Sequence, residues 1–249
     1  MTGKVYLVGA GPGRADLITI RARQVIDRGE VILYDQLAGE IVKTLPASAE
    51  LIDCGKYAGR HTLKQEEIEK IMITRAKEGR IVVRLKGGDP FLFGRGGEEL
   101  EALRSEGIDV ELVPGVTSAI AVPGCAGIPV THRDCASLLA IVTGHEDPLK
   151  EGGSVRWDLL AGMEGTIVIL MGVGNLSSIV DSLLKWGKDP QTPVAIIERG
   201  LTEKQRVTTG ALSTIVEIAD LTGVRPPAVI VIGSVVRLYR GEMLCGATR

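Results

Sequence analysis

Short runs of β-branched and other apolar residues recur along the first half of this chain. They occupy residues 5–8, 31–34, 81–85 and 110–113, and helix-length stretches separate them. This alternation of strand-like and helix-like segments is typical of an α/β fold with a largely parallel sheet. We therefore predict one α/β unit in the first half.

One of the intervening stretches has clear helical periodicity. Apolar residues recur at i, i+3, i+4 and i+8 between Ile68 and Ala76, which gives the segment one apolar face. Thr62 and Gln65 precede it with residue types that indicate a capping box. The pattern predicts a helix with this capping-box signature ahead of it.

A second set of strand-like runs follows in the other half of the chain. These runs lie at residues 138–142, 166–171, 194–197 and 228–232, and residues 176–184 form the clearest amphipathic helix in the sequence. The second half is therefore predicted to be another α/β unit of similar size.

A proline and a glycine interrupt the rhythm at Pro114 and Gly115, as in a connection between two units. We place a domain boundary here, with an N-terminal domain at residues 1–113 and a C-terminal domain at residues 114–249. A cleft between two such domains is the expected place for a ligand.

Composition narrows the classes of partner. The 249 residues carry a formal charge of −2 and only 3% aromatic side chains, which disfavours a nucleic-acid partner. No apolar segment approaches the roughly 20 residues that cross a bilayer, and no basic stretch followed by an apolar run opens the chain. We expect a soluble, cytoplasmic protein without a membrane partner.

The cysteines and histidines give no sign of a metal site. The four cysteines show no CxxC spacing, and the three histidines form no HExxH motif. We expect reduced thiols and no protein-bound metal. The cysteines are Cys54, Cys125, Cys135 and Cys245.

The glycine-rich turn at residues 9–13 superficially resembles a dinucleotide-binding loop. The third glycine of a GxGxxG motif would fall at Arg14, and Pro12 has no backbone N–H to donate to a phosphate. Asp35 ends the second strand about where a ribose-binding acid would lie, roughly 20 residues further on. A nicotinamide-dependent oxidoreductase is therefore an alternative, as is a plain tight turn.

A longer glycine-rich segment, RLKGGDPFLFGRGGEE, follows the third strand at residues 84–99. Glycine backbone at the carboxyl end of a strand lets a ligand approach closely, and Asp89 could bind a cationic or hydroxyl-bearing group. The alternative is a surface turn in which Asp89 caps a helix and Pro90 is its first residue.

Five sequence blocks occur in an order that resembles the tetrapyrrole methylase family, in particular the branch that methylates uroporphyrinogen III. A long GGDPF block followed by GIPVTHR is far more specific than a short glycine motif, and weaker matches continue to residue 233. The blocks are VGAGPG at 8–13, VILYDQL at 31–37, RLKGGDPFLFGRGGEE at 84–99, VPGVTSAIA at 113–121 and GIPVTHRD at 127–134.

The resemblance implies two α/β domains with S-adenosylmethionine in the cleft between them, and a homodimer. It also implies C-methylation of uroporphyrinogen III at C2 and C7, which gives precorrin-2 and S-adenosylhomocysteine. A sulfonium methyl is already activated, so its transfer needs alignment and no metal. The residues that fall on cofactor-contacting positions are Pro12, Gly87, Gly88, Asp89, Leu92, Thr117, Ser118, Met171, Gly200 and Ala228.

The same resemblance places a proton acceptor at Asp35 and a proton donor or carboxylate binder at Lys56. A carboxylate at Asp35 could hold pyrrole N–H groups, stabilise the developing cation and take up a proton. Lys56 could equally be a solvated surface lysine. The substrate is rich in carboxylates and needs basic partners. Candidates in or beside the matched blocks are Arg95, His132, Arg133 and Arg199.

Other activities are left open by the residues. They are a related corrin methyltransferase that acts on a later intermediate, a diphthine-forming relative, the nicotinamide enzyme and a ligand-binding module without catalysis. The GRGGEE and GIPVTHR blocks favour the uroporphyrinogen branch.

Overall fold

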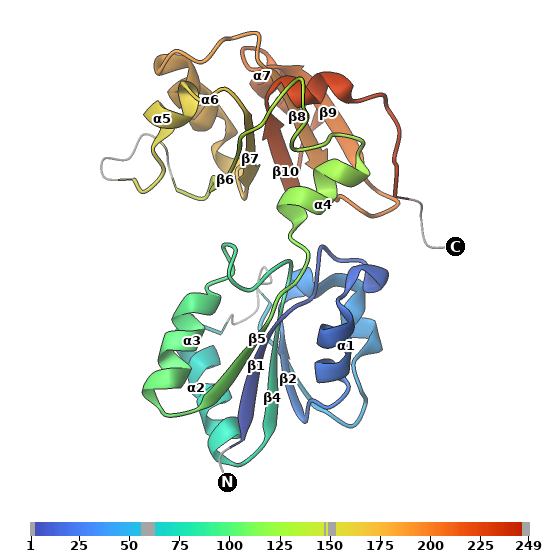
Figure 1. Ribbon diagram of the computed structural model, residues 1–249, viewed down its shortest axis with the longest axis vertical. Helices are drawn as coiled ribbons and strands as arrows, with labels where there is room; N and C mark the ends of the chain where they lie inside the picture. Colours follow the sequence, from blue (N-terminus) through green and yellow to red (C-terminus); the bar gives the residue numbers. More distant parts are fainter. Residues whose placement is uncertain (1–2, 56–62, 147, 149–152, 246–249) are drawn as a thin grey trace. The chain divides into compact units, whose positions relative to one another are not determined.

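The computed structural model describes residues 3–55, 63–146, 148 and 153–245. It divides into two compact units, Met1–Thr117 and Ser118–Arg249 (Figure 1). The boundary that we predicted from the sequence lies between residues 113 and 114.

The first unit is built on one five-stranded sheet in which every pairing is parallel. The strand order is β3-β2-β4-β1-β5, so β4 and β1 lie in the interior of the sheet. The four predicted strands are confirmed, and β3 was not foreseen because it is a short and largely exposed edge strand. The bounds are β1 Lys4–Gly9, β2 Val31–Tyr34, β3 Glu50–Asp53, β4 Ile81–Lys86 and β5 Asp109–Val113.

Helices cover both faces of this sheet (Figure 1). Alternate strand residues point to opposite faces, so Val5 and Leu7 pack with α2 and α3, whereas Val8 packs with α1 and η2. Apolar residues therefore fill both sides of the strands, as buried parallel sheets require. The helical elements are η1 Ala15–Leu17, α1 Ile20–Ile26, η2 Gln36–Thr44, α2 Gln65–Lys77 and α3 Gly96–Ser105.

Helix α2 is the helix predicted from the apolar periodicity, and it buries Ile68 and Ala76. Its first turn differs from the prediction, because the helix begins only at Gln65. The side chain of Glu67 accepts the backbone N–H of Lys64 at 2.6 Å and satisfies a donor of the first turn. Thr62 lies outside the described residues.

The second unit has a mixed five-stranded sheet in the order β6-β7-β10-β8-β9. Strands β6 and β7 are parallel and the other neighbours are antiparallel. The four predicted strands are present, and β9 was missed because its sequence RVTTGA has no apolar run. The bounds are β6 Leu139–Thr143, β7 Thr166–Leu170, β8 Pro193–Glu198, β9 Arg206–Ala211 and β10 Ala228–Ile232.

The main core of the second unit lies between one face of this sheet and α5, α6 and α7. Helix α6 is the predicted amphipathic helix, and it buries Ile179 and Leu183 against the strands. Helix α4 packs against β10 and β7. The helical elements are α4 Ser118–Cys125, α5 Trp157–Ala161, η3 Val173–Asn175, α6 Leu176–Lys185, α7 Ile215–Thr222 and η4 Ser234–Leu238.

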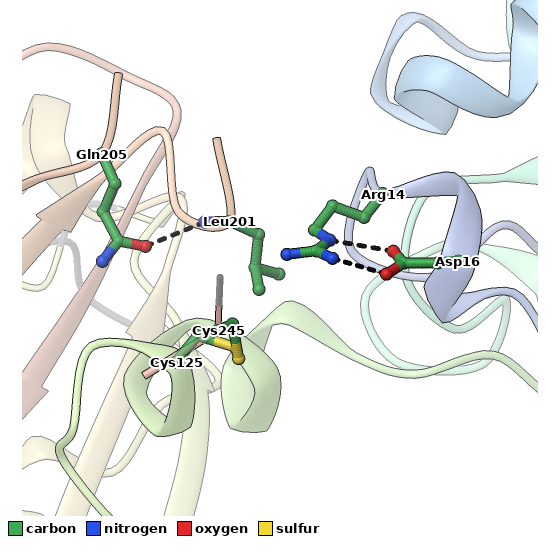
Figure 2. Close-up of a disulfide and its surroundings, with 6 residues drawn as sticks. All are labelled: Arg14, Asp16, Cys125, Leu201, Gln205 and Cys245. Atoms are coloured by element: carbon green, nitrogen blue, oxygen red, sulfur yellow. Dashed lines mark hydrogen bonds and ion pairs between the residues drawn. A yellow bond between two sulfur atoms is a disulfide. The ribbon is translucent and has the colours of Figure 1, made fainter. Parts of the chain in front are cut away.

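A disulfide joins the last residue of α4, Cys125, to Cys245 (Figure 2). Their Cα atoms are 4.9 Å apart, and the N–H of Leu244 donates to the carbonyl of Cys125 at 2.8 Å. The expectation of four reduced thiols is therefore wrong for two of them. These cysteines are 120 residues apart, so only the return of the C-terminal segment to α4 brings them together. Cys54 and Cys135 are free.

Within the part of the chain that the structure describes, no helix has the length and apolar character needed to cross a membrane.

Candidate functional site

Three glycines at the carboxyl ends of strands in the first unit bring their loops into direct backbone contact. A Cβ on Gly9 would lie 2.5 Å from the Cα of Gly115, and a Cβ on Gly115 would lie 2.2 Å from the carbonyl oxygen of Gly88. No side chain tolerates such distances, so the loops after β1, β4 and β5 need glycine to approach one another. They form a tight backbone platform at this edge of the sheet.

The loops after β1 and β4 are also joined by hydrogen bonds. The N–H of Gly88 donates to the carbonyl of Gly11 at 2.7 Å, and the N–H of Gly11 donates back at 3.2 Å. Gly11 and Gly88 both have positive φ, +75° and +68°, which favours glycine. Pro12 follows directly in the same loop. The structure thus brings Pro12 close to the predicted Gly87–Gly88 segment.

The loop after β1 lacks the feature that a dinucleotide needs. Helix α1 begins only at Ile20, and the extended residue Arg14 leads instead into η1. The side chain of Arg14 is paired with Asp16, as Figure 2 shows. Because no α-helix N-terminus follows the glycines directly, the phosphate site of a nicotinamide-binding loop is missing here.

Asp89 ties two of the loops together. Its Oδ1 accepts the N–H of Phe91 at 2.9 Å, and its Oδ2 accepts the N–H of Gly115 at 3.0 Å. The alternative in which Asp89 caps a helix is wrong, because the next helix, α3, begins at Gly96. Each carboxylate oxygen keeps a further lone pair, so Asp89 can still accept a ligand hydroxyl or amino group.

The segment between Asp89 and α3 has an unusual backbone. Phe93 and Arg95 both adopt positive φ, +54° and +59°, which costs free energy for residues with a Cβ. Leu92, which precedes Phe93 in the sequence, is partly buried. Its N–H donates to the Asp89 carbonyl at 3.3 Å. Arg95 forms an exposed ion pair with Glu98. Such strain in a glycine-rich loop is more common at binding sites than elsewhere.

Asp35 follows β2 at the same edge of the sheet and is part of a charged cluster. Nη2 of Arg84 lies 2.7 Å from Oδ1 of Asp35, and Nε of Arg84 lies 3.0 Å from Oε1 of Glu99. That glutamate oxygen also accepts from Nζ of Lys86 at 2.9 Å. Arg84, Lys86 and Glu99 are buried, whereas the Asp35 side chain is 28% exposed. Asp35 is therefore the member of the cluster that a ligand can reach.

Burial and pairing act in opposite directions on the cations of this cluster. Burial disfavours the charged form of Arg84, but Asp35 and Glu99 outweigh it and raise the pKa of the guanidinium. Burial, and then the charge of Arg84, lower the pKa of the Lys86 ammonium. Arg84 therefore stays positively charged beside Asp35.

In the second unit, three predicted cofactor residues gather at one edge of the sheet. Leu170 pairs with Val229 and Glu198 pairs with Ala228 in register, so the carboxyl ends of β7 and β8 meet the start of β10. Met171 directly follows β7, and Gly200 lies shortly after the end of β8. A half-exposed Met171, with 52% of its surface accessible, offers an apolar contact at this edge.

The backbone at this edge is also strained. Met171, Arg199 and Leu201 all have positive φ, at +57°, +45° and +68°. The N–H of Leu201 is held by Oε1 of Gln205 at 2.9 Å (Figure 2). Three non-glycine residues in left-handed conformation beside the predicted positions make the edge a candidate binding surface.

Gly200 is required by the packing of α4. A Cβ there would lie 2.4 Å from Cγ1 of Val122, in the helix that begins at Ser118. Ser118 therefore opens a helix that is anchored beside Gly200, and Thr117 is the last residue of the first unit. Apart from Thr117 and Ser118, the predicted cofactor residues of each unit lie at a strand end of their own sheet or in the loop that follows it.

Lys56, the second predicted catalytic residue, lies outside the described residues. Of the other basic candidates, His132 accepts the N–H of Asp134 at its Nδ1 at 3.2 Å, and Arg199 lies at the strained edge after β8. Neither His132 nor Arg133 belongs to a named strand or helix.

Sequence reasoning missed the buried members of the charged cluster, Arg84, Lys86 and Glu99. A signal was present, because two charged residues at i and i+2 share one face of a strand that is otherwise apolar. Interior parallel strands are normally apolar on both faces, so charges there indicate a function. No cluster of potential metal ligands is found among the described residues.

Comparison with known proteins identifies the family. Residues 4–216 match the family described as Tetrapyrrole (Corrin/Porphyrin) Methylases. An S-adenosyl-L-methionine-dependent uroporphyrinogen III methyltransferase of Methanosarcina barkeri is 57% identical, over 95% of this chain and 93% of that protein. A uroporphyrinogen-III C-methyltransferase of Methanocaldococcus jannaschii is 53% identical, over 97% and 100%.

A solved structure agrees with this assignment. The uroporphyrin-III C-methyl transferase of Thermus thermophilus, complexed with S-adenyl homocysteine, is 42% identical. It superimposes with a TM-score of 0.81 over 95% of this chain and 100% of that chain. The fold and the sequence lead to the same conclusion: the chain belongs to the tetrapyrrole methylase family.

Proposed function

We propose that this protein transfers methyl groups from S-adenosylmethionine to C2 and C7 of uroporphyrinogen III, which gives precorrin-2 and S-adenosylhomocysteine. The observation that carries the proposal is the near full-length identity of 57% to a methyltransferase of this kind from Methanosarcina barkeri. The lack of an α-helix directly after the glycine loop weighs against the nicotinamide enzyme.

The proposed cofactor residues fit a donor with a polar amino-acid end and an apolar, aromatic end. In the first unit, Gly87, Gly88 and Asp89 are partly accessible and offer peptide groups and a carboxylate. In the second, Met171 and Ala228 offer apolar surface beside Gly200. The bound sulfonium supplies an already activated methyl group.

Pro12, Leu92, Thr117 and Ser118 are the other proposed cofactor residues. Pro12 lies in the loop that is bonded to Gly88, and Leu92 lies in the strained segment after Asp89. The role of all these residues is to bind the donor and align it, because alignment is what methyl transfer to carbon requires.

Asp35 is proposed to act on the macrocycle. Its Oδ1 is bound by Arg84, and among the described residues no group occupies its Oδ2. That oxygen can accept pyrrole N–H groups, stabilise the positive charge that develops on the ring, and take up the proton that the ring then loses. Lys56 is proposed as a proton donor or carboxylate binder, and Arg95, His132, Arg133 and Arg199 as further partners of the substrate carboxylates.

The decisive experiment is an anaerobic incubation of the purified protein with both substrates, followed by mass analysis. We expect a product with two added methyl groups and stoichiometric S-adenosylhomocysteine. Parallel calorimetric titrations should show binding of S-adenosylhomocysteine and none of NAD(H). Activity only on a later, metal-bearing corrin intermediate would instead assign the protein to a related methyltransferase.

An Asp35→Asn variant tests the proposed role of the carboxylate. The substitution keeps the shape and one acceptor oxygen but removes the charge, so we expect methyl transfer to fall by at least roughly a hundredfold. Affinity for S-adenosylhomocysteine should change little. Near-normal turnover by this variant would remove Asp35 from the mechanism.

We further propose a cytoplasmic homodimer that needs neither nucleic acid nor membrane. The formal charge of −2 and the low aromatic content support the first exclusion. Sedimentation equilibrium at several protein concentrations would test the dimer, and a monomer at all of them would contradict it.

A further inference from the structure

The guanidinium of Arg84 lies in the interior of the first unit, on a strand that is flanked by neighbours on both sides. It reaches two carboxylates with different nitrogens, Nη2 to Asp35 at 2.7 Å and Nε to Glu99 at 3.0 Å. A planar guanidinium can hold two partners in a fixed geometry, whereas a lysine ammonium is a single point charge on a flexible stem. Arg84 therefore links the accessible Asp35 to a buried anchor.

The anchor is itself held in place. Oε1 of Glu99 accepts from Arg84, from Nζ of Lys86 at 2.9 Å and from Nε2 of Gln65 at 3.1 Å. Three donors from two elements converge on one buried oxygen. Glu99 cannot change rotamer without losing them, and this fixes the direction of the Arg84 side chain.

A cluster of this kind is expensive if its purpose is stability alone. Removing charges from water costs several kcal/mol per ion, and apolar residues of similar volume often stabilise a core as well or better. The exposed end of the cluster is Asp35, which is also the residue proposed to act on the substrate. The cluster joins the buried Glu99, through Arg84, to the accessible Asp35. Residues that orient a functional side chain are arranged in this way.

We propose that Arg84, anchored by Glu99, is a positioning residue for methyl transfer: it fixes the orientation of the Asp35 carboxylate where the substrate binds. The proposal rests on the function proposed above for Asp35. Arg84 binds Oδ1 and leaves Oδ2 for the pyrrole N–H groups. It thus sets which carboxylate oxygen of Asp35 meets the substrate.

The charged and titratable groups around Asp35 come from three elements. Arg84 and Lys86 lie on β4, Glu99 lies on α3, and the thiol of Cys54 follows β3. Among the described residues, Arg84 is the single cation in contact with Asp35. Removing it therefore takes away the one cationic partner that orients the Asp35 carboxylate among the described residues.

The test compares Arg84→Met with Lys86→Met. Each variant removes a buried cation of β4 and that cation's hydrogen bond to Oε1 of Glu99. Only Arg84→Met also removes the contact with Asp35. We expect kcat to fall by about a hundredfold in Arg84→Met, because Asp35 loses the contact that orients it. In Lys86→Met the fall should be about tenfold or less. The affinity of both variants for S-adenosylhomocysteine should stay near the wild-type value.

Arg84→Lys separates charge from geometry. It keeps a cation but loses the two-pronged guanidinium geometry, so we expect kcat to fall by roughly tenfold, less than in Arg84→Met. The KM for S-adenosylmethionine and the affinity for S-adenosylhomocysteine should change little. If Arg84→Met does not fold, this variant carries the test, and a wild-type kcat in it would overturn the proposal.

The outcomes distinguish this proposal from the one on which it rests. A wild-type kcat in Arg84→Met, or an equal fall of kcat in Lys86→Met, would overturn the role of Arg84 while leaving the methyltransferase activity in place. A wild-type protein that does not methylate uroporphyrinogen III would overturn both.

Discussion

Reduction of the Cys125–Cys245 disulfide should destabilise the second unit. The bond closes a loop with a sequence separation of 120 residues, all within that unit. In the loop-entropy description, a closure of this length restricts the unfolded chain by about 5 kcal/mol, and measured values are typically about 2–4 kcal/mol. We expect the free energy of unfolding of this unit to fall by about 2–5 kcal/mol on reduction.

The tryptophans make the measurement specific. Trp157 and Trp186 are the two tryptophans of the chain, and both lie in the second unit. Trp157 is buried in the core, so its fluorescence follows unfolding of that unit. With a urea dependence of about 2 kcal/mol per molar, the midpoint should drop by about 1–2.5 M in reductant.

Two variants complete the experiment. Cys245→Ser should reproduce the low midpoint without reductant, whereas Cys135→Ser removes a free thiol and should leave the midpoint unchanged. Thiol titration in denaturant without reductant should find two free thiols, Cys54 and Cys135. Four free thiols, or one midpoint shared by the oxidised and reduced protein, would refute the reasoning.

Three further predictions follow from individual contacts. Burial raises the pKa of the Cys54 thiol to about 11, so only about one Cys54 thiol in a thousand is ionised at pH 8. Iodoacetamide should therefore label Cys135 far faster than Cys54, and peptide mass analysis measures both labelling rates. Burial works to raise the pKa of Glu198, but the hydrogen bonds from Arg206 and a backbone N–H outweigh it and lower that pKa. The stability that Glu198 contributes is then present above its ordinary value of 4.5 and lost as the pH falls through the lower folded value. The loss of unfolding free energy in Glu198→Gln should be constant between pH 6 and 8 and shrink on acidification, and a gap that widens in acid would contradict this sign. Finally, Gly88→Val should weaken the binding of S-adenosylhomocysteine, as measured by calorimetry. Gly107→Val is the control, because Gly107 has a similar φ of +71° but lies at the opposite end of the sheet. It should strain the backbone equally and leave the affinity for S-adenosylhomocysteine unchanged.

Much of the secondary structure could be predicted because it is local. Apolar runs marked four strands in each unit, and the periodicity at residues 68–76 and 176–184 marked α2 and α6. Both missed strands, β3 and β9, are edge strands, and neither contains more than two consecutive apolar residues. Their pairing with a neighbour, rather than burial of their side chains, makes them strands.

The candidate site was predicted only in part. Glycine motifs located the loops, and the resemblance to a family named the residues in them. The contacts that fix those loops depend on distant partners: Gly115 meets Gly9 and Gly88, and Asp89 bonds Gly115. A sequence shows that glycine occurs at such a position but not which backbone approaches it.

The amino-acid pattern alone specifies which segments are strands and helices, because a segment's apolar period and turn residues are properties of that segment. Tertiary structure decided the mixed direction of the second sheet and the partners across long separations. Asp35 and Arg84 are 49 residues apart, and Cys125 and Cys245 are 120 apart. Such pairs form because folding of the whole unit places them together, and the free energy of each contact exists only once that fold is complete.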